Sequence, residues 1–115
     1  IHISGDEDGI FGKIFDIKME NARKPVQFSL SGNVAENWRR FELEFDIYIE
    51  CIGETTPRQK AMLLLNLAGH EAMERERAFV YAPGIEAQGG VEAVAAESRF
   101  DVVVLKRKFR EVCEP

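Results

Sequence analysis

The chain has 115 residues, 45% of them hydrophobic and 30% charged, which is the composition of an ordinary globular protein with one domain. Its formal net charge of −5 argues against nonspecific nucleic-acid binding, and no apolar run approaches the roughly 18–20 residues that cross a bilayer. The two cysteines form no disulfide framework, so we predict a reducing, cytoplasmic setting without a membrane partner.

Residues 1–18 differ in character from the rest, because short β-prone runs surround an acidic turn bounded by glycines. Met19 is a candidate start codon, so residues 1–18 are either an extension of upstream or vector origin or a native hairpin, and the helical domain spans 19–115. We expect part of Ile10–Ile17 to pack in strand-like form against the domain or a neighbouring copy, because a short tether raises its local concentration to about millimolar. Residues 19–32 should approach the domain in extended form.

A helix over residues 34–52 organises the chain. Asn33 is its expected N-cap, with Glu36 three residues on, and Gly53 supplies the stop. Seven apolar residues fall within an arc of about 100°, as a core-facing helix requires: Val34, Trp38, Phe41, Phe45, Tyr48, Ile49 and Ile52. A second apolar line, which we expect another surface to cover, lies on the opposite side: Leu43, Ile47 and Cys51.

A second helix is predicted to begin at Pro57, with Thr56 as its cap and Gln59 closing a capping box. Apolar residues lie nearly all round this helix, which is typical of a buried element, and Gly69 should end or kink it.

A charged helix is predicted over residues 70–81, with Glu71 and Arg75 paired at i,i+4. Residues 82–97 have the composition of a surface loop, in which the alanine-rich stretch EAVAAES is a candidate helical turn. Ser98 is the expected cap of the last helix. These elements predict an all-α fold, a small bundle of four to five helices with an extended or β-strand N-terminal segment.

The pattern F-x-x-S-G-N-x-x-x-x-W-x-x-F-x-x-x-F-x-x-Y over residues 28–48 resembles the capsid region of gypsy-like retrotransposon Gag proteins. The block RQK leading into LLLNLAGHEA, and the block FD leading into LKRKFREVCEP, are similar to that region as well. The likeness covers residues 25–115. It is to the N-terminal lobe of capsid, and domesticated Gag proteins such as Arc look similar.

The resemblance implies a structural domain that assembles with other copies of itself into a retroelement-type shell. RNA would be bound only through regions outside this sequence. The alternative is a domesticated adaptor that binds short extended peptides in a hydrophobic groove. The candidate groove or core residues are Phe28, Trp38, Phe41, Phe45 and Tyr48, and the candidate assembly face is Leu43, Ile47 and Cys51.

The residues of ordinary catalytic and metal chemistry do not gather in the sequence. His70 begins an H-E-x-x pattern that lacks the second histidine, and zinc catalysis needs three protein ligands. Cys51 and Cys113 have no histidine placed to activate them, so we expect both to be buried as small hydrophobes. We therefore predict that the chain is not an enzyme and has no catalytic, metal-binding or cofactor-binding residue.

Two charged clusters are expected to be structural. Carboxylates recur at i,i+4 along the central helix, where a solvated flank is favoured over an acid–base pair: Glu42, Asp46 and Glu50. Four cations lie near the C-terminus, where they suit the dipole of the last helix better than they indicate RNA contact: Lys106, Arg107, Lys108 and Arg110.

Overall fold

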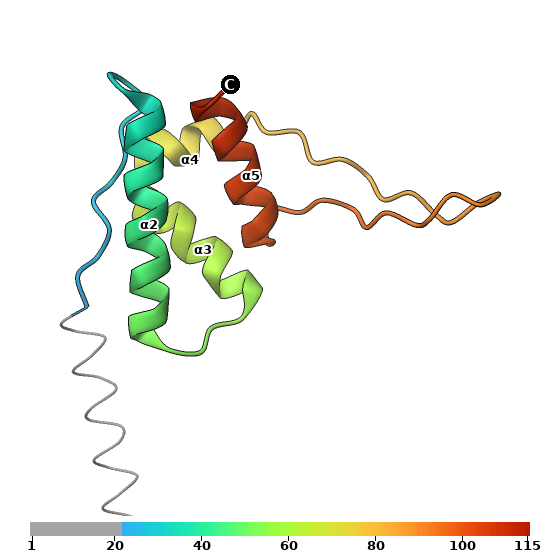
Figure 1. Cartoon of the computed structure of the whole chain (residues 1–115), viewed down its shortest axis with the longest axis horizontal. Coiled ribbons are helices and arrows are strands. Elements are labelled where there is room, and N and C mark those ends of the chain that lie inside the picture. Colours follow the sequence, from blue (N-terminus) through green and yellow to red (C-terminus); the bar gives the residue numbers. More distant parts are fainter. Residues whose placement is uncertain (1–21) are drawn as a thin grey trace, which may run out of the picture.

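The computed structural model describes residues 22–115, which contain four helices and no strand (Figure 1). The helices are α2 (Val34–Ile52), α3 (Pro57–Ala68), α4 (His70–Glu76) and α5 (Val102–Cys113). The all-α prediction is therefore confirmed for this part of the chain. The predictions about the origin of residues 1–18 and the packing of Ile10–Ile17 lie outside the described residues.

The core is an aromatic cluster built on one face of α2. Trp38 has no exposed surface and stacks on Phe109 of α5, with ring centroids 5.5 Å apart. Leu64 and Ala68 of α3 close the cluster from a third side. Because the aromatic residues of α2 recur at helical spacing, folding this helix places them on one line that α3 and α5 can cover.

The ends of the first two helices follow local sequence signals. The side chain of Asn33 accepts a hydrogen bond from the amide of Glu36, as predicted for the N-cap of α2. Thr56 and Gln59 form the reciprocal bonds of a capping box at the start of α3, with N–O distances of 3.1 and 2.9 Å. Gly69 ends α3 with a φ of 100°, a conformation that favours glycine.

The charged helix α4 is shorter than the sequence predicted, because it ends at Glu76 rather than at Tyr81. Beyond that point the chain turns so that Phe79 packs edge-on against Phe109, with centroids 4.9 Å apart. The predicted pairing of Glu71 with Arg75 is also wrong, since Glu71 accepts a hydrogen bond from the amide of Leu30 instead. Tertiary contacts thus override the helical pattern after Glu76.

The N-cap of α5 lies three residues later than predicted. Asp101 caps the helix by accepting a hydrogen bond from the amide of Val103, at 2.9 Å. Ser98 instead accepts a bond from the amide of Phe100, within the turn that leads into the helix. Asp101 therefore replaces Ser98 as the N-cap of α5.

Residues 22–31 are extended, as predicted, and run beside α2 (Figure 1). The amide of Val26 donates to a carboxylate oxygen of Glu44 at 2.9 Å, and Asn37 donates from its side chain to the carbonyl of Ser29. These bonds from two different turns of α2 fix the segment along the helix.

Residues 82–97 form a long arm that projects from the helical body between α4 and α5 (Figure 1). Its two extended segments are joined by isolated bridges between Ile85 and Val94 and between Gln88 and Val91, and we call these segments the strands of the arm. The alanine-rich stretch in it is extended, so the predicted helical turn is wrong. Gly89 and Gly90 turn the chain at the tip with φ values of 53° and 89°, which suits a two-residue hairpin turn. We call residues 82–97 the arm and its first and last residues the root.

Candidate assembly surface

The outer side of α2 carries large apolar side chains that the described residues leave uncovered. Leu43 is 62% exposed and Ile47 is 56% exposed, although Phe45 between them is buried in the core. Cys51, one turn further along, is exposed as well. The expectation that Cys51 is buried is therefore wrong. No element of residues 22–115 covers this face, and the expectation that another surface covers it stays a prediction. We call Leu43 and Ile47 the α2 patch.

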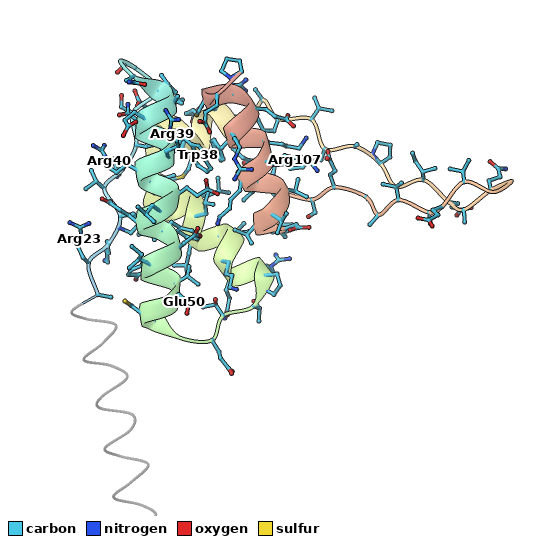
Figure 2. The ribbon with its side chains drawn as sticks, in the orientation of Figure 1. Arg23, Trp38, Arg39, Arg40, Glu50 and Arg107 are labelled. Carbon is cyan, nitrogen blue, oxygen red and sulfur yellow. The ribbon has the colours of Figure 1, made fainter. Side chains whose placement is uncertain are left out.

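Opposite charges lie at the two ends of the α2 patch. Arg40 precedes Leu43 by one turn and Glu50 follows Ile47 by one turn, so all four share one side of the helix. Both charged side chains are exposed, and Figure 2 shows Arg40 pointing away from the other helices. Neither has an ion-pair partner within the described chain. The α2 patch is therefore framed by charges that no residue in 22–115 neutralises.

The candidate groove residues lie almost wholly inside the core. Phe28, Trp38, Phe41 and Phe45 are at most 2% exposed, so their rings offer no surface to a peptide. Phe28 comes from the extended segment beside α2 and packs on the rings of Trp38 and Phe41 at 5.5 and 5.4 Å. The chain's own segment thus fills the space that a peptide groove at these rings would require.

Tyr48, another candidate groove residue, lines an open pocket with a largely apolar wall. This pocket has a volume of about 670 Å³ and lies between the end of α2 and the start of α3. Ile52, Met62 and Leu63 supply its apolar wall, and Arg58 stands at its edge. Met62 is 37% exposed, so the prediction that α3 is buried all round is wrong on this side.

The two charged clusters meet across α2 and α5. Lys106 lies within ion-pair distance of Glu42 and Asp46, and Arg110 approaches Glu42 at 3.0 Å. The acidic flank is therefore paired rather than simply solvated, with Glu50 as its exception. Because these cations already have carboxylate partners, the interpretation that they serve the fold is favoured over an RNA contact.

The root of the arm is fixed by a network around Glu97. One carboxylate oxygen of Glu97 accepts from the amide of Ala82 and from Lys108, each at 2.9 Å, and the other pairs with Arg107. The amide of Glu97 returns a bond to the carbonyl of Ala82. Both strands of the arm are thereby joined to each other and to α5 at one place.

Glu76 supplies a second anchor for the arm. This carboxylate is 5% exposed, accepts a hydrogen bond from the hydroxyl of Tyr81 at 2.7 Å, and pairs with Arg99 at 3.2 Å. Burial, together with the bond to Glu76, raises the pKa of Tyr81 above its usual range. Since Tyr81 and Arg99 flank the two strands, the end of α4 holds the arm from both sides.

Groups of chemical interest are scattered in the described chain. His70 is exposed at the start of α4, and residues 22–115 contain no group of three or more histidines, cysteines or carboxylates able to hold a metal ion. Cys113 is buried, and desolvation raises the pKa of its thiol to about 11, which opposes formation of a nucleophilic thiolate. None of the four described helices is long and apolar enough to cross a membrane.

The arm and its anchors were not found from the sequence. Nothing in the sequence distinguishes Glu76 and Glu97 from surface carboxylates, because their partners lie in other elements. The pair Gly89-Gly90 was the available signal, since two glycines between two short runs are typical of a hairpin turn. Comparison of the chain with protein-family models, with curated proteins and with solved structures finds no match, so the resemblance to Gag capsid lobes stays a prediction.

Proposed function

We propose that this chain is a structural domain that assembles with copies of itself into a larger protein shell. The observation that carries the proposal is the α2 patch. Leu43 and Ile47 lie one turn apart and are exposed on the same helix that bears the core. Exposed apolar surface framed by polar residues is typical of protein–protein interaction sites. The resemblance to capsid N-terminal lobes also implies self-assembly.

The charges beside the patch favour a second copy as the partner. If two α2 helices cross antiparallel about a two-fold axis midway between Leu43 and Ile47, each Leu43 meets the Ile47 of the other copy. The same axis places Arg40 beside the Glu50 of the other copy, because both pairs are centred on residue 45. One antiparallel contact would therefore bury the apolar residues and neutralise both free charges. A two-fold interface is self-complementary in this way.

A substitution in the patch tests this proposal. Leu43→Glu should weaken assembly of the chain into large species by about tenfold or more, because a carboxylate would be buried without a partner. The measurement is sedimentation velocity across a concentration series. Val103→Glu is the matched control, since Val103 is 69% exposed on α5. Equal association of the two variants would contradict the proposal, and circular dichroism would verify that both keep their helices.

A charge exchange tests the orientation of the contact. Arg40→Glu should weaken association, because it places two glutamates together at each end of the contact. Adding Glu50→Arg to the same chain should restore association, since the pair is then reversed rather than lost. A double variant as weak as Arg40→Glu alone would rule out the antiparallel arrangement.

The second candidate function is the peptide-binding adaptor, which the pocket beside Tyr48 favours. Its wall of Ile52, Met62 and Leu63 would accept one apolar side chain of an extended peptide. Titration of the chain with a fluorescent apolar peptide tests this function, with Leu63→Arg as the variant that blocks the pocket. Saturable binding that Leu63→Arg abolishes, by a chain that stays monomeric, would favour the adaptor over the assembly domain.

A further inference from the structure

Beyond its root, the arm has few internal bonds and two open edges. Ile85 and Val94 exchange backbone hydrogen bonds of 2.8 Å, and Gln88 and Val91 exchange bonds of 3.1 and 2.9 Å. Between the root residues, no other backbone group of the arm is hydrogen-bonded within the described chain. A single two-stranded hairpin is only marginally stable in water, whereas three or more strands with an apolar face are stable.

The edge formed by residues 91–97 lacks the usual protection. Proteins guard exposed strand edges with lysine, proline or bulges, because unpaired amides and carbonyls are a template for another strand. The sequence VEAVAAE contains neither lysine nor proline, whereas Pro83 interrupts the opposite strand. Its alanines are small and exposed, so another backbone can approach closely.

We propose that residues 91–97 pair antiparallel with the same residues of a second copy, about a two-fold axis at Val94. Val91, Val94 and Glu97 bond inward to the other side of the arm, whereas the amides and carbonyls of Ala93 and Ala95 have no backbone partner within the described chain. In this register Ala93 of one copy faces Ala95 of the other, so these unpaired groups bond to each other as an antiparallel pair does.

Charge disfavours one of the two neighbouring registers. With the axis at Val94, Glu92 lies opposite Ala96 of the second copy, and Glu97 lies opposite Val91. Moving the axis by half a residue toward Ala95 would place Glu92 directly opposite Glu97, and like charges in that position are destabilising. The register at Val94 therefore joins two copies without a charge conflict.

The paired arms would also gain an apolar face. Ile85 and Val94 form a bonded cross-strand pair, so their side chains lie on the same face of the hairpin, and they are 56% and 55% exposed. Pairing two arms brings the two Val94 side chains together, and with Ile85 on each outer side they form one row of apolar side chains across the four strands. Four strands with one apolar row provide what the isolated hairpin lacks.

This inference rests on the proposed function and completes it. A two-fold contact through α2 joins two copies and then closes, so by itself it cannot extend. A second two-fold contact at the arm, which projects from the body away from α2, would link one pair to the next (Figure 1). A chain with both contacts can therefore grow beyond a dimer.

The experiment measures each contact with the other one disabled, using sedimentation velocity on the full 115-residue chain from about 1 μM to about 1 mM. Leu43→Glu leaves only the arm contact, and Val94→Lys leaves only the α2 contact, because two lysines would face each other at the axis. The parent should grow beyond dimers, each single variant should stop at dimers, and the double variant should stay monomeric. Val80→Lys is the matched control, since Val80 is 81% exposed but lies outside the arm.

The outcomes separate the two proposals. A Leu43→Glu chain that is monomeric at every concentration would overturn the arm contact and leave the α2 contact standing. A Val94→Lys chain that is monomeric at every concentration would overturn the α2 contact and leave the arm contact standing. In the Leu43→Glu background, mixing Val94→Lys with Val94→Glu chains should strengthen association about tenfold or more over either alone, because opposite charges then meet at the axis. Failure of the mixture to associate would also overturn the proposed register.

Discussion

The helical body and the arm use their aliphatic residues in opposite ways. In the body, Leu64 and Leu105 have no exposed surface, because α3 and α5 pack on the aromatic face of α2. In the arm, Ile85 and Val94 are more than half exposed, and only the root is fixed to the body. Stability therefore resides in the body and at the root, while the outer arm is free to make contacts with other molecules.

The largest expected effect belongs to the centre of the body. Trp38→Ala should lower the free energy of unfolding by about 3–5 kcal/mol, because the indole is fully buried among aromatic rings. Urea denaturation followed by circular dichroism measures this. Arg40→Ala on the exposed side of the same helix should change it by less than about 0.5 kcal/mol. A loss below about 1 kcal/mol for Trp38→Ala would contradict the packing of α2.

The second-largest expected loss of stability follows from a change at the root of the arm. Glu97→Ala removes the acceptor for the amide of Ala82 and the partner of Lys108, and should cost about 1–2 kcal/mol. Amide hydrogen exchange should accelerate at the root in this variant. Glu92→Ala is the control in the outer arm, and it should leave stability within about 0.5 kcal/mol of the parent. If the two glutamates proved equivalent, the division between root and outer arm would be wrong.

Alkaline pH should weaken the body through Cys113. The unfolded thiol ionises near its usual 9.0, whereas burial raises the folded pKa to about 11, so the unfolded chain loses its proton first. The stability that the buried, protonated thiol of Cys113 contributes is complete below pH 9 and declines as the pH rises to 11, by an amount on the order of 1 kcal/mol. Tyr81, whose pKa is also raised, adds a decline in the same direction once the pH passes its usual value of 10.0.

Unfolding free energies at pH 8 to 11 would test this decline in the parent and in two variants. Cys113→Ser should flatten the fall between pH 9 and 10, below the range in which Tyr81 contributes, whereas Cys51→Ser should keep it, because Cys51 is exposed. A fall that Cys113→Ser leaves unchanged would assign the alkaline sensitivity to another group.

The smallest expected effect on stability comes from the outer arm itself. Replacing residues 84–95 by an Asn-Gly turn should change the free energy of unfolding by less than about 0.5 kcal/mol, because these residues add nothing to the core and loop length costs little. Circular dichroism melts would measure the change. A loss of more than about 1 kcal/mol would show that the outer arm supports the body.

Local signals explain what the sequence could predict. The caps at Asn33 and Thr56 and the stop at Gly69 depend on residues within one turn, so the pattern contained them. The buried face of α2 was also predictable, because its period is that of a helix. The periodicity of α2 also shows its other apolar line, but it cannot show that no element of residues 22–115 packs on Leu43 and Ile47.

Tertiary contacts explain the remainder. The helical pattern continues past Glu76, but α4 ends there because Phe79 packs on Phe109. Alanine favours helix, yet residues 93–96 are extended because the glycine turn brings them beside the strand that begins at the root. The bonds of Glu97 to α5 likewise join residues whose proximity no local pattern reveals.

The closed root has one more consequence, which concerns insertion of foreign sequence. Because Ala82 and Glu97 are bonded to each other, the chain leaves the body and returns to it at a single place, whatever lies between. A peptide or small folded domain placed between Gly89 and Gly90 would be displayed away from the helices and would not alter their spacing. Doubling the length of such a loop costs only about 0.6 kcal/mol in closure entropy. The tip of the arm is therefore a display position on the single domain, where added sequence projects away from the helices.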